Sequence, residues 1–232
     1  MRHALLLLVL SASVVMVACG GSASSTPAPA GRGKKVDPAT AGTLTGRVTF
    51  TGTPPAPEPL QINEDPICLQ ALGDAKSDAL LVSADGRVQN AFVYIKDMLA
   101  EYAFDVPTEA VRLDEKGCRY SPRIFGVRVS QALEIGQPVE GSRMTQFFTA
   151  PEVMVRFKCD VHHWMSAYGG VMSHPFFAVT GPDGSFSMKG LPPGEYELAV
   201  WHEKLGTKTQ LVTIGASQTQ TANFILTRVS NE

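Results

Sequence analysis

Three soft metal-ligand side chains lie within seven residues in the second half of the chain. Cys159, His162 and Met165 offer a thiolate, an imidazole and a thioether, directly after the β-branched and aromatic stretch 153–157 that predicts a strand. A short loop at a strand end can turn all three toward one point. Together with a second imidazole, they are the ligands of a blue-copper electron-transfer centre. The spacing therefore predicts a metal site.

Other chemistries fit the same residues less well. A structural zinc site usually shows paired Cys-x-x-Cys or His-x-His spacing and no thioether. A catalytic cysteine–histidine pair needs the two side chains to face each other and a third group to orient the base, and the sequence shows no such group. Taken singly, each residue could also be an ordinary buried or hydrogen-bonded side chain.

The motif Cys159-x-x-His162-x-x-Met165 resembles the ligand loop of the cupredoxins, and its flanks resemble bacterial envelope proteins of the methylamine-utilisation-like group. The segment Gly117-Cys118-x-Tyr120-x-Pro122 adds to this resemblance, which covers about residues 43–172. It implies a cupredoxin-like Greek-key sandwich that binds copper and passes one electron to a redox partner protein. Cys159, His162 and Met165 would then be the copper ligands, with Met165 axial.

The chain departs from the family at the first copper-ligand histidine. Family members carry it in a loop after the strand that corresponds to 133–135, but here Ile135 continues directly into Gly136-Gln137-Pro138. No histidine lies between His3 and His162. The remaining candidates for a second imidazole are adjacent to His162 or lie in the C-terminal part: His163, His174 and His202.

Two functional interpretations follow from this departure. In the first, the protein is an envelope-anchored cupredoxin that binds copper and carries an electron. In the second, it is a surface or periplasmic β-sandwich lipoprotein with a degenerate metal site, whose role is binding or scaffolding. Binding of Cu(I) by Cys159 and Met165 stands between the two, since thiolate and thioether are soft donors.

Residues 173–232 carry a second pattern. Asp183-Gly184-x-Phe186, followed by Leu191-Pro192-Pro193-Gly194-x-Tyr196, is similar to the carboxypeptidase-regulatory-like domain, a small transthyretin-like Greek-key sandwich. About 55 residues are few for an independent sandwich. One interpretation is therefore that this domain also includes the strand at 44–50. The domain would then be discontinuous in sequence, with the cupredoxin-like part inserted between its two pieces. The fold class expected for the whole chain is all-β.

The N-terminus predicts export. Basic residues precede an apolar run at 4–18 that is shorter than the ~20 residues of a membrane span, which is typical of a signal peptide. Met16-Val17-Ala18-Cys19 resembles a bacterial lipobox, which implies a signal at 1–19 and a mature chain anchored through acylated Cys19; an ordinary signal cut near Ala18 is the alternative. Residues 20–42 read as a flexible linker. We expect the protein to lie in the bacterial cell envelope, anchored on the periplasmic face of the outer membrane.

Export also constrains the cysteines, of which the chain has four. If Cys19 carries lipid, an odd number remains in an oxidising compartment. Pairing Cys68 with Cys118 leaves Cys159 free for metal, and the alternative is that Cys68 and Cys118 are separate thiols.

Composition limits the remaining functions. The chain has 232 residues and a net charge of −2, which gives no support for nucleic-acid binding. We see no hydrolytic triad, no paired acids in a plausible cleft and no nucleotide loop, so an enzyme is not expected.

Several local elements can be assigned from turn and cap signals. Asp65-Pro66 predicts a short helix through Ala71 that ends at Gly73. Asp85-Gly86 predicts a hairpin between 79–83 and 88–95. Residues 98–104 suggest a helical turn. The stretches 144–149 and 153–157 read as a pair of strands joined by 150–152.

Overall fold

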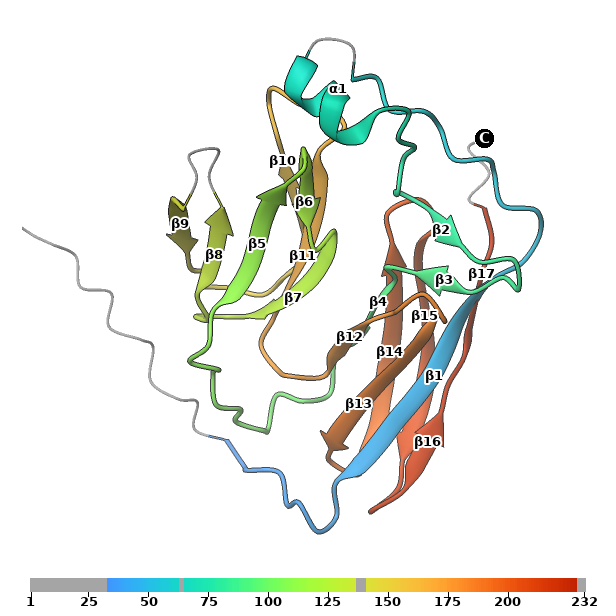
Figure 1. The fold of residues 1–232 in the computed structure, drawn as a ribbon. Coiled ribbons are helices and arrows are strands. Elements are labelled where there is room, and N and C mark those ends of the chain that lie inside the picture. The colour runs from blue at the N-terminus through green and yellow to red at the C-terminus, as the bar shows by residue number, and fades with distance from the viewer. Residues whose placement is uncertain (1–32, 63–64, 137–140, 229–232) are drawn as a thin grey trace, which may run out of the picture.

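The computed structural model describes residues 33–62, 65–136 and 141–228, which form seventeen strands and one helix (Figure 1). The all-β expectation is confirmed. The expected signal peptide at 1–19, the lipidation site Cys19 and the linker as far as residue 32 lie outside the described residues. The one helix of the described part is too short to cross a membrane.

Two sheets form a sandwich built largely from the C-terminal part of the chain. The first sheet contains β1 (Gly42–Phe50), β13 (Ser185–Leu191), β16 (Thr219–Thr221) and β17 (Phe224–Leu226). The second contains β4 (Phe92–Ile95), β12 (Phe177–Val179), β14 (Gly194–His202) and β15 (Gly206–Ile214). A small hairpin, β2 (Leu81–Val82) and β3 (Val88–Gln89), lies beside them. We call this unit the C-terminal sandwich.

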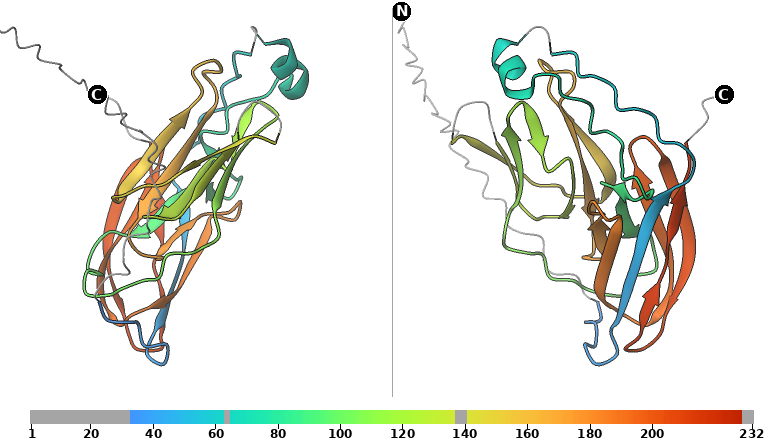
Figure 2. Two further views of the ribbon diagram at one scale, coloured as in Figure 1. Left: turned by 90° about the vertical axis from the view of Figure 1, so that its left-hand side faces the viewer. Right: turned by 45° about the vertical axis from the view of Figure 1, so that its right-hand side comes forward.

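Two further sheets form a second unit, the central sandwich. One contains β7 (Ile124–Arg128), β10 (Glu152–Lys158) and β11 (Ser166–Met172). The other contains β5 (Val111–Lys116), β6 (Arg119–Ser121), β8 (Leu133–Gly136) and β9 (Arg143–Gln146). The helix α1 (Pro66–Leu72) lies over one end of this sandwich, close to β6 and β10 (Figure 2).

The C-terminal sandwich draws two strands from the earlier part of the chain. β1 pairs antiparallel with β13 and parallel with β16 and β17, so the strand at 44–50 is recruited. β4 lies between β12 and β14. Its residues fall within the range 43–172 expected for the cupredoxin-like part, although its partner strands belong to 173–232. A stretch of about 55 residues thus gains the two strands that it needs to enclose a core.

Apolar clusters fill the spaces between successive sheets. One cluster lies inside the C-terminal sandwich and another inside the central sandwich. The third joins the two units, because it combines side chains of β4, β12 and β14 with side chains of β7 and β11. β4 is buried along its whole length, which explains why its sequence is a continuous apolar run rather than an alternating one.

Glycines allow the two sandwiches to approach. A Cβ added at Gly170 of β11 would lie 2.3 Å from the Phe92 ring, and one at Gly126 of β7 would lie 2.1 Å from the Phe177 ring. Each ring therefore occupies the space that a side chain at the neighbouring glycine would need. Beside this apolar contact, Arg123 donates two hydrogen bonds to Glu203, at 2.6 and 2.9 Å, and so links the segment before β7 to the turn after β14.

Several local predictions are confirmed and others are wrong. α1 begins after the cap Asp65 and ends at Gly73, as the sequence indicated. The stretches 144–149 and 153–157 are not a pair: β9 pairs with β8 and β10 pairs with β11, in different sheets. The residues at 98–104 form turns and no helix. Asn90 has a φ of 63° and divides the expected strand 88–95 into β3 and β4.

The end of the expected linker is docked. Lys34 forms an isolated parallel bridge with Tyr102, and its ammonium lies 2.7 Å from the carboxylate of Glu101. Lys35 makes a similar ion pair with Asp105. Basic residues of the expected flexible linker therefore contact the segment at 101–105.

Candidate metal centre

The loop between β10 and β11, residues 159–165, here called the metal loop, brings Cys159 and His162 together. The backbone N–H of Cys159 donates to the carbonyl of Met165, and the N–H of Met165 donates to the carbonyl of His162, which closes the loop. The Cys159 Sγ then lies 3.7 Å from His162 Nδ1, and the His162 backbone N–H points at the same sulfur from 3.4 Å. Cys159 is a half-buried free thiol, and Met165 is buried directly before β11. Two of the three predicted ligand side chains thus face each other.

Asp65 completes this arrangement from a distant part of the sequence. One carboxylate oxygen, Oδ1, accepts the backbone N–H groups of Ile67 and Cys68 and so caps α1. The other, Oδ2, lies 2.9 Å from His162 Nε2. The Cys68 N–H and, after it, His162 hold the pKa of Asp65 below its usual value. With Nε2–H donating to the carboxylate, the lone pair of Nδ1 faces the thiol.

A carboxylate on the far nitrogen is the usual outer partner of a metal-bound histidine, because it fixes the ring and its tautomer. The same three groups also resemble a nucleophile, a base and an orienting acid. The sequence alone shows no orienting group. It indicates Asp65 only as a helix cap, and no local signal connects residue 65 to residue 162.

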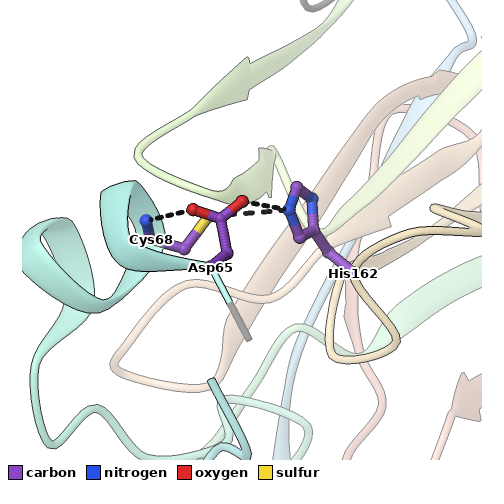
Figure 3. Close-up of side chains that lie close together, drawn as sticks. All are labelled: Asp65, Cys68 and His162. Carbon is purple, nitrogen blue, oxygen red and sulfur yellow. Dashed lines mark hydrogen bonds and ion pairs between the residues drawn. The ribbon is translucent and has the colours of Figure 1, made fainter. Parts of the chain in front are cut away.

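A disulfide fixes α1 above the loop. Cys68 of α1 is bonded to Cys118 in the turn between β5 and β6, with the Cα atoms 5.6 Å apart. The indole N–H of Trp164 donates to the Cys118 carbonyl at 3.0 Å, and the His162 and Trp164 rings lie 5.0 Å apart. Of the two arrangements that the sequence left open, the structure has the bonded one. Cys68 Sγ lies 3.8 Å from His162 Nε2 (Figure 3).

No second imidazole joins Cys159 within the described residues. The one group there of three or more His, Cys, Asp or Glu residues with ligand atoms within 4.8 Å of one another is Asp65, Cys68 and His162. His163 is exposed. His174 is buried, with Nε2–H donating to the Ile95 carbonyl and Nδ1 accepting the Phe176 N–H. Among the described residues, the donor set of a type 1 copper centre is therefore incomplete.

His174 and His202 are buried in their uncharged forms. Burial lowers the pKa of His174 to about 4, with a smaller contribution from the charge of Arg128. Burial likewise lowers the pKa of His202 to about 4, assisted by the charge of Arg123. Nδ1 of His202 accepts the backbone N–H of Lys204. Both imidazoles thus serve the packing of the C-terminal sandwich.

A cleft of about 440 Å³ lies away from the metal loop. Three aromatic side chains, Tyr94, Tyr102 and Phe104, line it together with charged groups. Phe104 packs edge-on against Phe176, with ring centroids 5.3 Å apart. The Arg128 guanidinium lies 5.9 Å from the centre of the Phe104 ring. These contacts hold the aromatic wall in place.

Comparisons with known proteins support the C-terminal part of the interpretation. Residues 171–227 match the model of the carboxypeptidase regulatory-like domain. No curated protein matches the chain. One solved structure is that of a Pseudomonas aeruginosa protein provisionally described as carbohydrate-binding. It is 14% identical, the match covers 83% of this chain and 92% of that one, and the TM-score is 0.26. A TM-score this low assigns neither fold nor ligand. None of these matches is a cupredoxin.

Proposed function

We propose that this protein is a β-sandwich binding protein of the bacterial envelope, and that its Cys159 loop is a degenerate metal site. The observation that carries this choice over electron transfer is the single imidazole beside Cys159. A blue-copper centre holds its metal with a thiolate and two imidazoles in one near-trigonal plane. Here the described residues supply one imidazole, and its second nitrogen is bound to Asp65.

The cleft indicates the chemistry of the ligand. Ligand pockets in proteins combine apolar and aromatic walls with a few polar groups that fix orientation. The aromatic side chains Tyr102 and Phe104 offer flat apolar faces, and Lys96, Asp97 and Glu152 offer hydrogen-bonding groups around them. Such a combination suits a ring that carries hydroxyl groups, because its C–H face can pack on an aromatic ring while its hydroxyls bind the charged groups. We therefore assign a sugar-like ligand to the cleft.

Calorimetric titration with a panel of neutral mono- and disaccharides tests this proposal, with the corresponding open-chain polyols as chemical controls. We expect a saccharide to bind and its affinity to fall about tenfold in Tyr102→Ala, since loss of an aromatic contact costs on the order of 1 kcal/mol. Phe147→Ala is the matched control, because Phe147 is an exposed aromatic side chain (47%) that does not line the cleft. Binding that is equal in wild type and Tyr102→Ala would contradict the proposal.

A second candidate function is Cu(I) binding at the loop. The 3.7 Å approach of Cys159 Sγ to His162 Nδ1 favours it, together with the carboxylate that fixes the ring. Soft donors prefer Cu(I). We expect purified protein to lack intense blue absorption with Cu(II), added imidazole to restore part of a thiolate-to-copper band, and Cys159→Ser to abolish that band. Intense blue colour without added imidazole would reinstate the electron-transfer interpretation.

We further propose that acylated Cys19 anchors the protein to the membrane. Fractionation of cells that express the wild-type chain or Cys19→Ser tests this. The wild type should sediment with membranes and the variant should be released. A wild-type protein that is already free of the membrane after export would show that the anchor proposal is wrong.

A further inference from the structure

Three potential metal ligands converge between α1 and the metal loop. Asp65 Oδ2 lies 2.9 Å from His162 Nε2, and Cys68 Sγ lies 3.8 Å from the same nitrogen (Figure 3). All three ligand atoms lie within 4.8 Å of one another. The side chains come from two segments about a hundred residues apart, and all three point into the same space. This group uses Nε2 of His162, whereas Cys159 approaches Nδ1 on the other side of the same ring.

The spacing is close to that of a tetrahedral zinc site. With Zn–N and Zn–O distances of about 2.1 Å and a Zn–S distance of about 2.3 Å, tetrahedral geometry places nitrogen and oxygen about 3.4 Å apart, and nitrogen and sulfur about 3.6 Å apart. The corresponding separations here are 2.9 and 3.8 Å. A zinc ion would take the place of the proton shared by Asp65 and His162, which would open the N–O separation by about 0.5 Å and close the N–S separation by about 0.2 Å.

Oxidation of Cys68 prevents this in the disulfide form. A disulfide sulfur is not a thiolate, so Asp65 and His162 alone remain as ligands, and two ligands do not make a structural zinc site. Reduction of the disulfide increases the number of available metal ligands. Two electrons and two protons from a dithiol convert the Cys68–Cys118 bond into two thiols, while the dithiol becomes a disulfide. Loss of a proton from each thiol on metal binding then gives two thiolates beside one imidazole and one carboxylate.

We propose that reduction of the Cys68–Cys118 disulfide creates a zinc site with Asp65, Cys68, Cys118 and His162 as ligands. The carboxylate is already oriented, because its other oxygen caps α1. Cys118 is adjacent to Cys68, since the two sulfurs are bonded in the oxidised form, and as thiolates on one zinc ion they would separate to about 3.8 Å. Two thiolates, an imidazole and a carboxylate are ligands that zinc accepts. The site is independent of the cleft, so either proposal can fail alone.

Cobalt(II) is a spectroscopic probe for this site, because tetrahedral thiolate-bound Co²⁺ absorbs strongly in the visible and near-ultraviolet. Every protein in the experiment carries Cys19→Ser, so that the thiols are those of residues 68, 118 and 159. We expect the reduced protein to develop the tetrahedral cobalt bands, zinc to displace the cobalt, and the oxidised protein to show neither effect. Cobalt bands of equal strength in the oxidised protein would overturn the proposal.

Single variants then identify the ligands. Asp65→Asn and His162→Gln in the reduced protein should lose at least about tenfold in zinc affinity, the lower limit observed for groups one shell further from a metal. Cys159→Ser is the matched control and should keep the bands. Bands that persist in Cys68→Ser and disappear in Cys159→Ser would place the metal at the Cu(I) candidate site and refute this assignment.

A double variant covers the case in which the reduced wild type unfolds. Cys118→Ser with Cys159→Ser leaves Cys68 as a permanent thiol beside Asp65 and His162. Folding is checked by circular dichroism. We expect this variant to bind cobalt without any reductant and to lose that binding when Asp65→Asn is added. A folded double variant that binds no cobalt would overturn the proposal.

Discussion

Acidification from pH 7 to pH 5 should destabilise the protein through two buried histidines. His174 and His202 are 6% and 1% exposed, and each has its pKa lowered from 6.5 to about 4 by burial. Between these values the unfolded chain binds protons that the folded chain excludes. The stability that each histidine contributes is therefore complete above about pH 6.5 and is lost as the pH falls toward 4.

The size of the effect follows from the two pKa values. For one histidine with a pKa of 6.5 in the unfolded chain and about 4 in the folded chain, linkage gives a loss of about 2 kcal/mol between pH 7 and pH 5. Both histidines together give about 4 kcal/mol, a large fraction of the 5–15 kcal/mol that is typical of a folded protein. Carboxylates whose pKa is lowered, such as Asp65, titrate mainly below this window.

Urea unfolding followed by tryptophan fluorescence at the two pH values measures this loss. In His174→Gln, the pH-dependent loss should shrink by about 2 kcal/mol, whatever the substitution does to stability at pH 7. His163→Gln is the matched control, because His163 is exposed. An unchanged pH dependence in His174→Gln, or an imidazole titration of His174 near pH 6.5 by NMR, would refute the explanation.

Two stability predictions concern the contact between the sandwiches. Gly170→Ala places a Cβ 2.3 Å from the fully buried Phe92 ring, so it should destabilise by about 1–3 kcal/mol in a urea titration; a neutral effect would show that the sheets can separate slightly. Glu203→Ala removes the bidentate partner of the nearly buried Arg123 guanidinium, which keeps its ion pair with Asp78, and should cost about 1.5–3 kcal/mol. Glu101→Ala breaks an exposed pair and should have a much smaller effect, and equal losses in the two variants would contradict the argument.

The strand β11 shows why part of the fold escaped prediction from the sequence. Gly169 and Gly170 lie in its middle, and glycine lowers strand propensity because it adds backbone entropy and no side-chain packing. In the structure, the rings of Phe125 and Phe92 fill the spaces above these two glycines. The glycines are required by contacts with strands that are distant in sequence, and such contacts leave no local pattern.

Elements with strong local signals were predictable. α1 has an Asp cap, a proline in its first turn and a glycine at its end, and each of these acts within a few residues. The strand β4 lies within the stretch 88–95, which the sequence predicts as a strand. Its partners could not be read from the sequence, because a strand buried on both faces carries no alternation that indicates a neighbour.

The contacts of the metal loop show the same difference between local contacts, which the sequence predicts, and distant contacts, which it does not. Cys159 and His162 are three residues apart, so a single loop decides their approach, and the sequence placed them together. Asp65 is 97 residues from His162, and its contribution depends on where α1 is held. That position is set by the Cys68–Cys118 disulfide. A residue identified correctly as a helix cap thus has a second role that only the tertiary structure shows.

The two sides of the His162 ring are chemically coupled, and this limits how the loop can be used. A neutral imidazole carries one N–H, which here faces Asp65 while the lone pair of Nδ1 faces the Cys159 thiol. In the proposed zinc form, Nε2 gives up that proton to bind the metal, so the N–H of a neutral ring moves to Nδ1 and points at Cys159. The ring then has no lone pair for a copper ion beside Cys159. Because one imidazole must serve both positions, zinc at the reduced site and copper at Cys159 should exclude each other.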